Sequence, residues 1–182
     1  MFNIQRFATN KIPELLNDYR VYEEGKDNFV GATNVEIAGL STKTVDISGI
    51  GLAGEISAPV VGHFESIEVT INWRVPTQRA ITITGGAAIA LEIYGDIQGW
   101  DSGDSKYVHQ QLKVTVRGRG KNYEGGTIEP MNTMDSSNTI EVHYLKYELD
   151  GKEILLIDKY NYIFKINGVD LMEPIRKNVG MN

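Results

Sequence analysis

Apolar and polar residues alternate strictly between Ile67 and Val75, and this is the clearest pattern in the chain. One set of alternate positions is entirely apolar: Ile67, Val69, Ile71, Trp73 and Val75. The set between them is entirely polar: Glu68, Thr70, Asn72 and Arg74. A repeat of two residues is typical of a β-strand, because successive side chains point to opposite faces. The segment therefore predicts a strand with one buried face and one wet face.

The last third of the chain predicts a β-hairpin, which we place at residues 138–166. Two long strand-like runs, Thr139–Leu149 and Glu153–Ile166, flank the dipeptide Asp150-Gly151. Asp-Gly favours a type I′ turn, because both central residues of that turn need a positive φ. Both faces of the second run carry apolar residues, so we expect it to be covered on both sides, by its own core and, in an oligomer, by a neighbouring subunit.

Shorter runs of the same kind add further strands. They are Val35–Ile37, Thr44–Ser48, Ala80–Thr84, Ile89–Tyr94 and Leu112–Val116. We expect Thr44–Ser48 to be the hairpin partner of the Ile67–Val75 strand. Polar loops are expected at Gln98–Tyr107 and Tyr123–Ser137, and helical turns at Ile12–Leu16 and Leu171–Val179. Many strands separated by turn signals predict a mainly β fold, an antiparallel sandwich or barrel with a short helix.

The composition is that of one soluble domain. The 182 residues are enough for a single core, and we expect an N-terminal arm at residues 1–28 followed by one β-rich domain at 29–182. Cysteine is absent, which excludes disulfides, thiolate metal sites and a cysteine nucleophile. A net charge of −6 argues against a protein that binds nucleic acid through the phosphate groups. No signal peptide or membrane span is expected, because no apolar run is long enough.

The motifs that could carry catalysis or cofactor binding all lack their structural context. Gly49, Gly51 and Gly54 match a dinucleotide fingerprint, but the β-branched, proline-containing segment after them does not predict the helix that would hold phosphate. A tightly turned loop explains these glycines better. The three histidines are scattered, and the Asp101–Asp104 segment lacks the glutamate of a calcium loop. We therefore expect no enzyme, no catalytic or metal-binding residue and no cofactor.

One basic cluster, Arg117-Gly118-Arg119, leaves three interpretations open. The two arginines fall on one face of a strand, where they could pair with carboxylates of a neighbouring subunit, form plain surface or touch nucleic acid. The candidate carboxylates are Glu23, Glu24 and Glu68. Nearby tyrosines at 144, 147, 160 and 162 are expected to pack in the core or at an interface, because balancing acidic residues make a base-stacking platform unfavourable.

Several segments together resemble one protein family. They are Gly49–Gly54 with Ala58–Val60, Val116–Arg119, Asp150–Glu153, Ile157-Asp158 with Asn161, Val169-Asp170, and the residues Arg176, Asn178 and Gly180. In this combination the chain resembles the major tail tube protein of contractile-tailed phages, which also occurs in tail-like bacteriocins. The resemblance runs from about Leu15 to the C-terminus and is weakest at residues 75–106. Known members place a helix there, whereas the pattern of this chain favours strands.

The resemblance implies a structural role. Members form hexameric rings whose inner strands join into one barrel, and the rings stack into a tube that conducts DNA or ions. It implies that the wet strand face lines the channel, with Asp46, Glu68, Thr70, Asn72 and Arg74 as candidates. It also implies that the glycine-rich loop at 49–62 reaches the next ring, with Gly49, Gly51, Gly54 and Pro59 as candidates. Arg117 and Arg119 are candidates for pairing between subunits.

The resemblance also implies partners and a location. The partners are the tail sheath, the tape-measure protein and a baseplate hub or tube-initiator protein, while DNA passes without specific binding and the chain inserts in no membrane. Assembly would take place in the bacterial cytoplasm, and the product would be a virion or an extracellular tail-like particle. The alternative is a monomeric β-sandwich that binds a ligand such as carbohydrate, for which Trp100 is the candidate contact.

Overall fold

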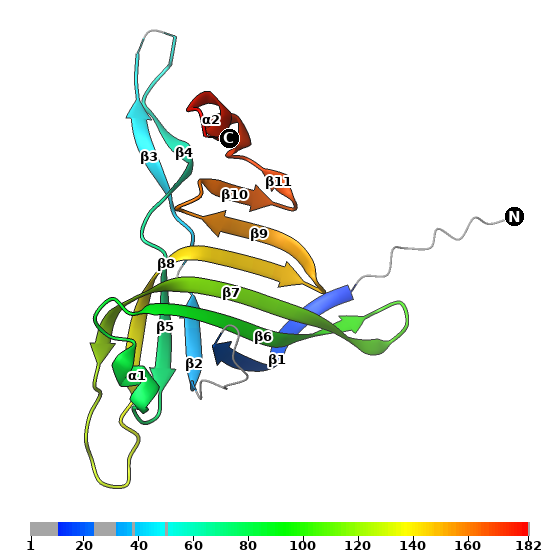
Figure 1. The fold of residues 1–182 in the computed structure, drawn as a ribbon. Coiled ribbons are helices and arrows are strands. Elements are labelled where there is room, and N and C mark those ends of the chain that lie inside the picture. Colours follow the sequence, from blue (N-terminus) through cyan, green and yellow to red (C-terminus); the bar gives the residue numbers. More distant parts are fainter. Residues whose placement is uncertain (1–10, 24–31, 38, 50, 182) are drawn as a thin grey trace, which may run out of the picture.

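The computed structural model describes residues 11–23, 32–37, 39–49 and 51–181. Strands make up 61% of the chain and the helices are short, which confirms the mainly β, antiparallel prediction. The strands are β1 (Lys11–Glu23), β2 (Asn34–Ile37), β3 (Thr42–Ile47), β4 (Ile56–Phe64), β5 (Glu68–Trp73), β6 (Ala88–Asp101), β7 (Lys106–Glu124), β8 (Ser136–Leu149), β9 (Lys152–Asp158), β10 (Ile163–Ile166) and β11 (Val169–Asp170). The helices are α1 (Gln78–Thr82) and α2 (Glu173–Asn178) (Figure 1).

The main sheet forks at β8. Its long path runs β1-β6-β7-β8-β9-β10-β11, with every pair antiparallel, and β5 joins β8 from the side. The first part of β8 pairs with β5, from Trp73 opposite Ser136 to Glu68 opposite Glu141. The second part pairs with β9, ending with Leu149 opposite Lys152. One strand therefore belongs to two arms, and β2 extends the β5 arm on its far side.

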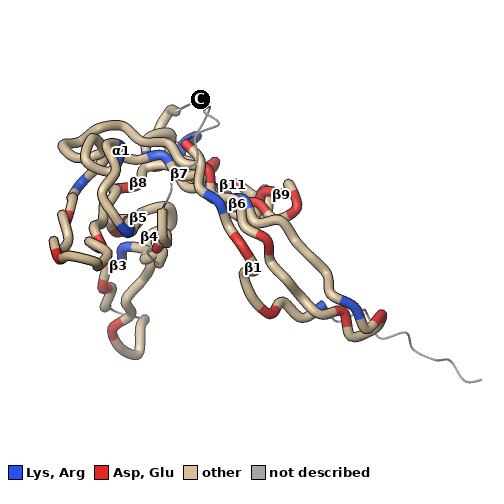
Figure 2. The backbone as a smooth tube through the Cα atoms, turned by 90° about the horizontal axis from the view of Figure 1, so that it is seen from below, with Lys and Arg blue, Asp and Glu red and all other residues tan. Residues whose placement is uncertain are grey.

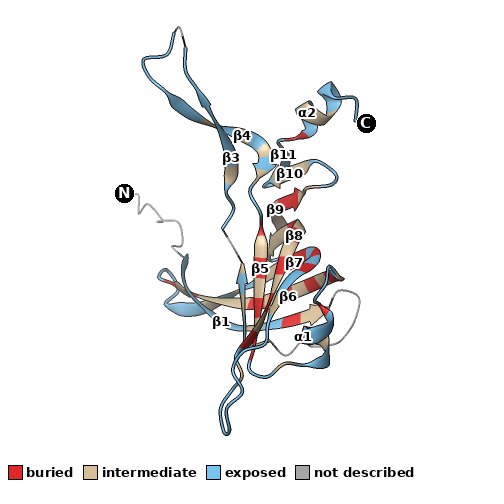
Figure 3. Ribbon diagram, turned by 90° about the vertical axis from the view of Figure 1, so that its left-hand side faces the viewer, coloured by how far each residue is buried: buried red, intermediate tan, exposed pale blue. Residues whose placement is uncertain are grey.

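The hydrophobic core fills the space between these arms. It is built from the apolar sides of the alternating strands: Val21, Ile67, Val69, Ile71, Trp73, Ala80, Ile83, Ile89, Leu91, Ile93, Val114, Val116, Ile140, Val142, Leu145 and Ile157. The buried stretches gather where β5, β6, β7 and β8 meet (Figure 3). Trp73 lies in this core, and its indole Nε1–H donates to Asn138 Oδ1 at 2.9 Å, so its polar atom is satisfied.

The helix α1 corrects the prediction of a strand at Ala80–Thr84. The side chain of Thr77 accepts a hydrogen bond from the Ala80 N–H at 3.1 Å and caps the first turn. Ala80 and Ile83 are buried against the core, and the chain then turns through Gly85-Gly86, both at φ +80°. The resemblance placed a helix in this region, and the pattern of β-branched residues was misleading because burial and capping outweigh local propensity.

The β6–β7 hairpin is longer than the sequence pattern indicated. The predicted loop at Gln98–Tyr107 is wrong, because the strands continue to Asp101 and resume at Lys106. The Asp101 side chain accepts hydrogen bonds from the N–H groups of Gly103 and Asp104 and closes a tight turn. Beyond the end of β8 the hairpin projects from the body together with β1 (Figure 2).

The β1 strand corrects the helical turn expected at Ile12–Leu16. It pairs with β6 from Lys11 opposite Asp101 to Glu23 opposite Leu91, so part of the region assigned to an arm belongs to the sheet. The register shifts between Pro13 and Leu15, where the proline has no N–H to donate to the ladder. The backbone hydrogen bonds offered by the edge of β6 outweigh the weak helical tendency of this short segment.

The predicted turn at Asp150-Gly151 is confirmed, and the two residues have φ of 49° and 75°. The second run of this hairpin is not one strand, however. It breaks after Asp158, whose carboxylate accepts hydrogen bonds from the N–H groups of Tyr160 and Asn161, and the chain reverses into β10. The helix predicted near the C-terminus is confirmed as α2, with a proline in its first turn.

The strand β3 does not have the predicted partner. It pairs with β4, with Val45 opposite Ala58 and Ile47 opposite Ile56, and forms a separate two-stranded sheet. The places beside β5 are taken by β2 and β8 instead. Alternation specifies which face of a strand is buried, but the choice of partner is settled by contacts between distant parts of the chain.

Candidate functional site

The wet face predicted for the Ile67–Val75 strand exists on β5. Val69, Ile71 and Trp73 are 0–1% exposed, whereas the polar residues between them are half-buried. Pairing places further polar residues on the same face: Asn34 and Glu36 on β2, and Ser137, Thr139 and Glu141 on β8. Glu68, Thr70 and Asn72 therefore lie at the centre of a continuous polar face, which we call the β2–β5–β8 face.

Hydrogen bonds order the side chains on this face. The Asn72 amide donates to Asn34 Oδ1 and to Glu36 Oε1, the latter at 3.0 Å. Lys121 forms an ion pair with Glu68 at one end of the strand. These contacts fix rotamers across three strands, so the face is preorganised rather than loosely solvated.

Two side-chain hydrogen bonds hold the Glu141 carboxylate on the β2–β5–β8 face. Burial alone would raise the pKa of Glu141, but hydrogen bonds from Ser66 and Lys159 outweigh it and the pKa lies below its ordinary value. Glu141 is thus ionised at neutral pH, and with Glu36 and Glu68 it gives the face three carboxylates. Lys121 and Lys159 pair with Glu68 and Glu141, so much of the negative charge on this face is balanced within the chain.

Two of the predicted channel residues lie apart from this centre. Arg74 follows β5 and is exposed at the end of the face. Asp46 lies on β3 in the separate hairpin, so the structure does not bring it together with Glu68, Thr70 and Asn72. Sequence reasoning grouped Asp46 with them because it assumed that β3 pairs with β5.

The β3–β4 hairpin has one apolar face and one polar face. Val45, Ile47 and Ile56 share the apolar face and remain 44–56% exposed. The opposite face carries Asp46 beside Ser57. A two-stranded sheet has little stability of its own, and an open apolar face of this kind is suited to contact with another surface.

The glycines of the predicted ring-to-ring loop lie at the tip of this hairpin. Gly49, Gly51 and Gly54 all belong to the turn between β3 and β4, and Gly51 has φ of 98°, which favours glycine. A Cβ added at any of the three would meet no atom within 4 Å. Pro59 is instead a strand residue of β4, opposite Thr44. The expected loop at 49–62 is therefore shortened to a tip at residues 48–55 of a projecting hairpin, whose position Figure 1 shows.

Arg117 and Arg119 point away from the core on β7 and lie over aromatic rings. The Arg117 guanidinium is 4.8 Å from the centre of the Tyr144 ring, and that of Arg119 is 5.8 Å from the Tyr160 ring. These are cation–π distances.

The carboxylates expected to meet these arginines have partners in their own chain. Glu68 pairs with Lys121, and Glu23 pairs with Arg79 at 2.6 Å, whereas Glu24 lies outside the described residues. Pairing of Arg117 and Arg119 with another subunit stays a prediction.

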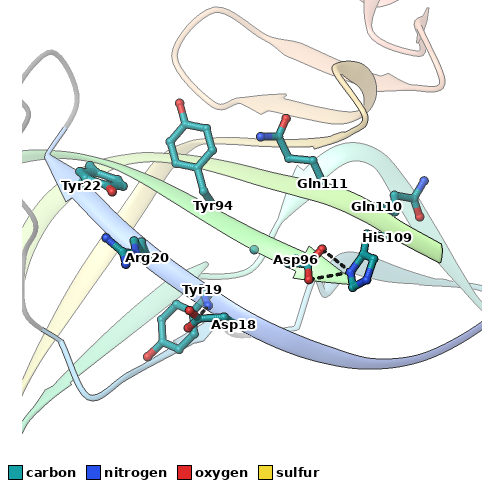
Figure 4. A pocket seen from close by; sticks show the side chains of 10 residues that line it. Asp18, Tyr19, Arg20, Tyr22, Tyr94, Asp96, His109, Gln110 and Gln111 are labelled. Carbon is teal, nitrogen blue, oxygen red and sulfur yellow. Dashed lines mark hydrogen bonds and ion pairs between the residues drawn. The ribbon is translucent and has the colours of Figure 1, made fainter. Parts of the chain in front are cut away.

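A shallow hollow of about 650 Å³ on the outer side of β1, β6 and β7 was not foreseen from the sequence (Figure 4). Its lining includes Tyr19, Tyr22 and Tyr94, and a hydrogen-bonded pair of Asp96 and His109 with 2.9 Å between Oδ2 and Nδ1. Hydrogen bonds from Asn17 and His109 lower the pKa of Asp96. No sequence signal marked the pair, because its members meet only through the β6–β7 register.

The described residues offer little to other kinds of site. Among them, no group of three His, Cys, Asp or Glu side chains is placed to hold a metal. Within residues 11–23, 32–37, 39–49 and 51–181, no helix is long and apolar enough to cross a membrane. Trp100, the candidate carbohydrate contact, lies on β6 and packs edge-to-face on Tyr107 with 5.1 Å between the ring centres.

The fold combines a forked antiparallel sheet, a polar strand face and a projecting hairpin. A solved sheath/tube terminator of the extracellular contractile injection system PVC, in its extended state, has the same fold, with a TM-score of 0.50 at 10% identity over 75% of this chain and 96% of that chain. The model of the phage tail tube protein FII family matches residues 13–180, and the chain belongs to that family.

A curated relative supports this assignment. The tail tube protein of Escherichia phage P2 is 28% identical over 176 residues, which cover 93% of this chain and 99% of the relative. The resemblance found in the sequence is therefore confirmed, and the chain is a tail tube component of contractile tail systems. Members of this family are structural proteins rather than enzymes.

Proposed function

We propose that this chain forms hexameric rings that stack into the inner tube of a contractile phage tail or tail-like particle. The observation that carries the proposal is the family match, which spans residues 13–180 and so includes nearly every element of the fold. The projecting hairpin and the polar strand face support it, because a tube needs contacts between rings and a wet inner wall.

The β2–β5–β8 face is the proposed inner wall. Its other side packs into the core of the subunit, so this face is free to meet the channel. Among the described residues β2 pairs only with β5, so its outer edge offers backbone groups to a neighbouring copy. Closing the sheet around a ring would satisfy such edges, which otherwise invite aggregation.

The chemistry of this face suits passage without binding. Glu68 and Glu141 hold Lys121 and Lys159 in ion pairs, which keeps these cations from phosphate groups, while the amide of Asn72 and the hydroxyl of Thr70 keep the wall hydrated. DNA or ions would move through the channel without a specific site. In this arrangement Asp46 continues the polar lining along the hairpin, and Arg74 sits at its rim.

The β3–β4 hairpin is the proposed contact between rings. Its tip carries Gly49, Gly51 and Gly54, and its apolar face, with Pro59 on the opposite side, would be covered by the adjacent ring. Arg117 and Arg119 are proposed to meet carboxylates of a neighbouring subunit within the ring. These contacts give each ring both lateral and axial neighbours.

The remaining partners follow from a position inside a contractile tail. We propose that the sheath surrounds the tube, that the tape-measure protein occupies it during assembly, and that a baseplate hub or tube-initiator protein starts it. Assembly would occur in the bacterial cytoplasm, and the product would be a virion or an extracellular particle. The relative from phage P2 and the PVC structure represent these two kinds of particle.

One experiment tests assembly and the inner wall together. The chain has no cysteine, so Asn72→Cys introduces a single thiol. We expect the purified variant to form rings or tubes in negative-stain images and light scattering. In tubes the thiol should react with a small maleimide but not with a large polyethylene-glycol maleimide, whereas separated protomers should react with both.

Protein that stays monomeric at every concentration and salt tested would refute the assembly proposal and favour the monomeric binding module, which a glycan array would then test. Tubes in which the large reagent reacts as readily as the small one would keep the assembly but remove the β2–β5–β8 face from the channel.

A further inference from the structure

The β3–β4 hairpin is poorly attached to the body through its backbone. Among the described residues, β3 and β4 pair only with each other. At the base, Thr42 lies opposite Phe64, and the Glu65 N–H donates to the Ser41 carbonyl at 2.8 Å. The two chain segments that enter β3 and leave β4 can act as a hinge. Only side-chain contacts can then fix the angle between the hairpin and the body.

One side chain reaches the hairpin at its base. Gly62 in β4 has φ of 75°, and a Cβ placed there would lie 1.9 Å from the Sδ atom of Met172. Met172 directly precedes α2 and is only 2% exposed. The thioether thus occupies the space that a side chain on β4 would need, and the missing Cβ of Gly62 forms its socket.

A second contact lies beside the first. The ring of Phe64 on β4 meets the ring of Phe164 on β10 edge-on, with 5.0 Å between centres and 84° between planes. Both rings are half-buried against the core. The two contacts at the base of the hairpin therefore come from one stretch of the chain, which runs from β10 through β11 to α2 (Figure 1).

That stretch is itself held rigidly. Arg176 on α2 donates to the Tyr162 carbonyl at 2.7 Å and pairs with the Asp170 carboxylate at 2.8 Å. The Met172 N–H donates to the other oxygen of Asp170 at 3.0 Å. Since α2 has no buried residue of its own, these bonds are what present Met172 to the hairpin.

We propose that Met172 in the Gly62 socket is a clasp by which the β10–β11–α2 stretch sets the angle between the β3–β4 hairpin and the body. The residues are positioning residues, because they do not form the outer surface of the hairpin. The consequence for assembly rests on the proposed function: the clasp holds the hairpin at the angle at which it meets the next ring.

The test measures the hairpin angle directly. Ser57→Cys on the hairpin and Lys152→Cys at the start of β9 are both exposed positions in a chain without cysteine, and nitroxide labels there report the distance between hairpin and body. Labelled protein is diluted with unlabelled protein, so that pulsed electron paramagnetic resonance records distances within one chain. In the labelled protein that keeps Met172, which is the parent, we expect a narrow distribution of label-to-label distances. In Met172→Ala we expect this distribution to be broader and its mean to be shifted.

Two matched controls separate the clasp from general effects. Met131→Ala removes the same side chain from a fully exposed position and should leave the distribution unchanged. Gly62→Ala should broaden it, whereas Gly85→Ala, after α1, should not, because both glycines have positive φ but only Gly62 has Met172 within 4 Å. The two glycine variants carry similar backbone strain, so a difference between them reports the lost socket.

If the label-to-label distances in Met172→Ala have the same mean and the same narrow spread as in the protein with the native Met172, the clasp is refuted. Loss of the near-ultraviolet circular dichroism of the core in Met172→Ala would also overturn it, since Met172 would then support the body rather than the hairpin. Equal broadening in the two glycine variants would point to strain alone and would have the same consequence.

The outcomes also separate the clasp from the proposed function. If the parent forms no rings, but its distance distribution is narrow and broadens in Met172→Ala, the clasp is supported and the proposed assembly into tubes is refuted. If the parent forms tubes, but the distance distribution of its isolated chain is already broad, the assembly into tubes is supported and the clasp is refuted. If both hold, Met172→Ala should form rings that stack into fewer and shorter tubes than those of Met131→Ala.

Discussion

Two hairpins with glycine in their turns, β8–β9 and β3–β4, differ in whether their apolar faces are covered. In β8–β9 the apolar side is covered, with Leu145 and Ile157 each 1% exposed. In β3–β4 the apolar side is open, with Ile47 and Ile56 nearly half exposed (Figure 3). The first hairpin therefore stabilises the subunit, whereas the second contributes little to its stability and is available to another chain.

The comparison separates two kinds of hydrophobic residue. Burial within the chain stabilises the fold whether or not other copies are present. Apolar area that is exposed in the single chain lowers the free energy only when a partner covers it. Substitutions in the two regions should thus differ in which property they change, and three predictions test this, from the largest effect to the smallest.

Trp73→Ala should have the largest effect, because it removes a fully buried ring from the core between the two arms. We expect a loss of about 3–5 kcal/mol in the free energy of unfolding, as is typical for a large aromatic side chain. The change also leaves the Asn138 amide oxygen without its donor. Urea unfolding measures the loss. Trp100→Ala, on the outer side of β6, is the control and should cost clearly less; an equal cost would contradict the placement of the core.

Ile47→Ser with Ile56→Ser should change assembly instead of stability. Both side chains are already exposed, so the free energy of unfolding should change by no more than about 0.5 kcal/mol. Tube formation, followed by negative-stain microscopy, should be strongly reduced because the apolar face no longer matches its partner. Asp46→Ser with Ser57→Ala alters the other face and is the control. Tubes of normal length in the Ile47/Ile56 variant would show that this face is not the contact.

Mild acid should act on the body of the subunit through His143, at the fork of β8. Burial, and then the positive charge of Arg119, lower the pKa of His143 below its ordinary 6.5. The unfolded state therefore binds more protons just below pH 6.5, so stability falls as the pH drops from 6.5 towards the lower pKa of the folded state. Urea unfolding at several pH values should show a small decrease that His143→Gln abolishes and His63→Gln retains. If the free energy of unfolding depends on pH equally in both variants, the decrease arises from groups other than His143.

The sequence was informative wherever a local signal decides the structure. Strict alternation identified the buried and wet faces of β5, and Asp150-Gly151 identified the β8–β9 turn. The same alternation placed Glu68, Thr70 and Asn72 on one face of the strand. In each case the geometry of a few consecutive residues determines the outcome.

The sequence was misleading wherever distant residues decide. β-branched residues suggested a strand at 80–84, but the cap from Thr77 and burial of Ile83 make a helix. Asp46 was grouped with the β5 residues because strand partners cannot be read from alternation. The Asp96–His109 pair had no signal at all, since it depends on the long register of β6 with β7.

The fork at β8 has a mechanical consequence. Because the same strand bonds to β5 and to β9, a pull on the β5 arm passes into the other arm through backbone hydrogen bonds, without crossing a loop. The path continues through β10 and α2 to the base of the hairpin. We expect the paired strands to transmit a load applied at one end of the sheet through several backbone hydrogen bonds at once, which would stiffen the subunit.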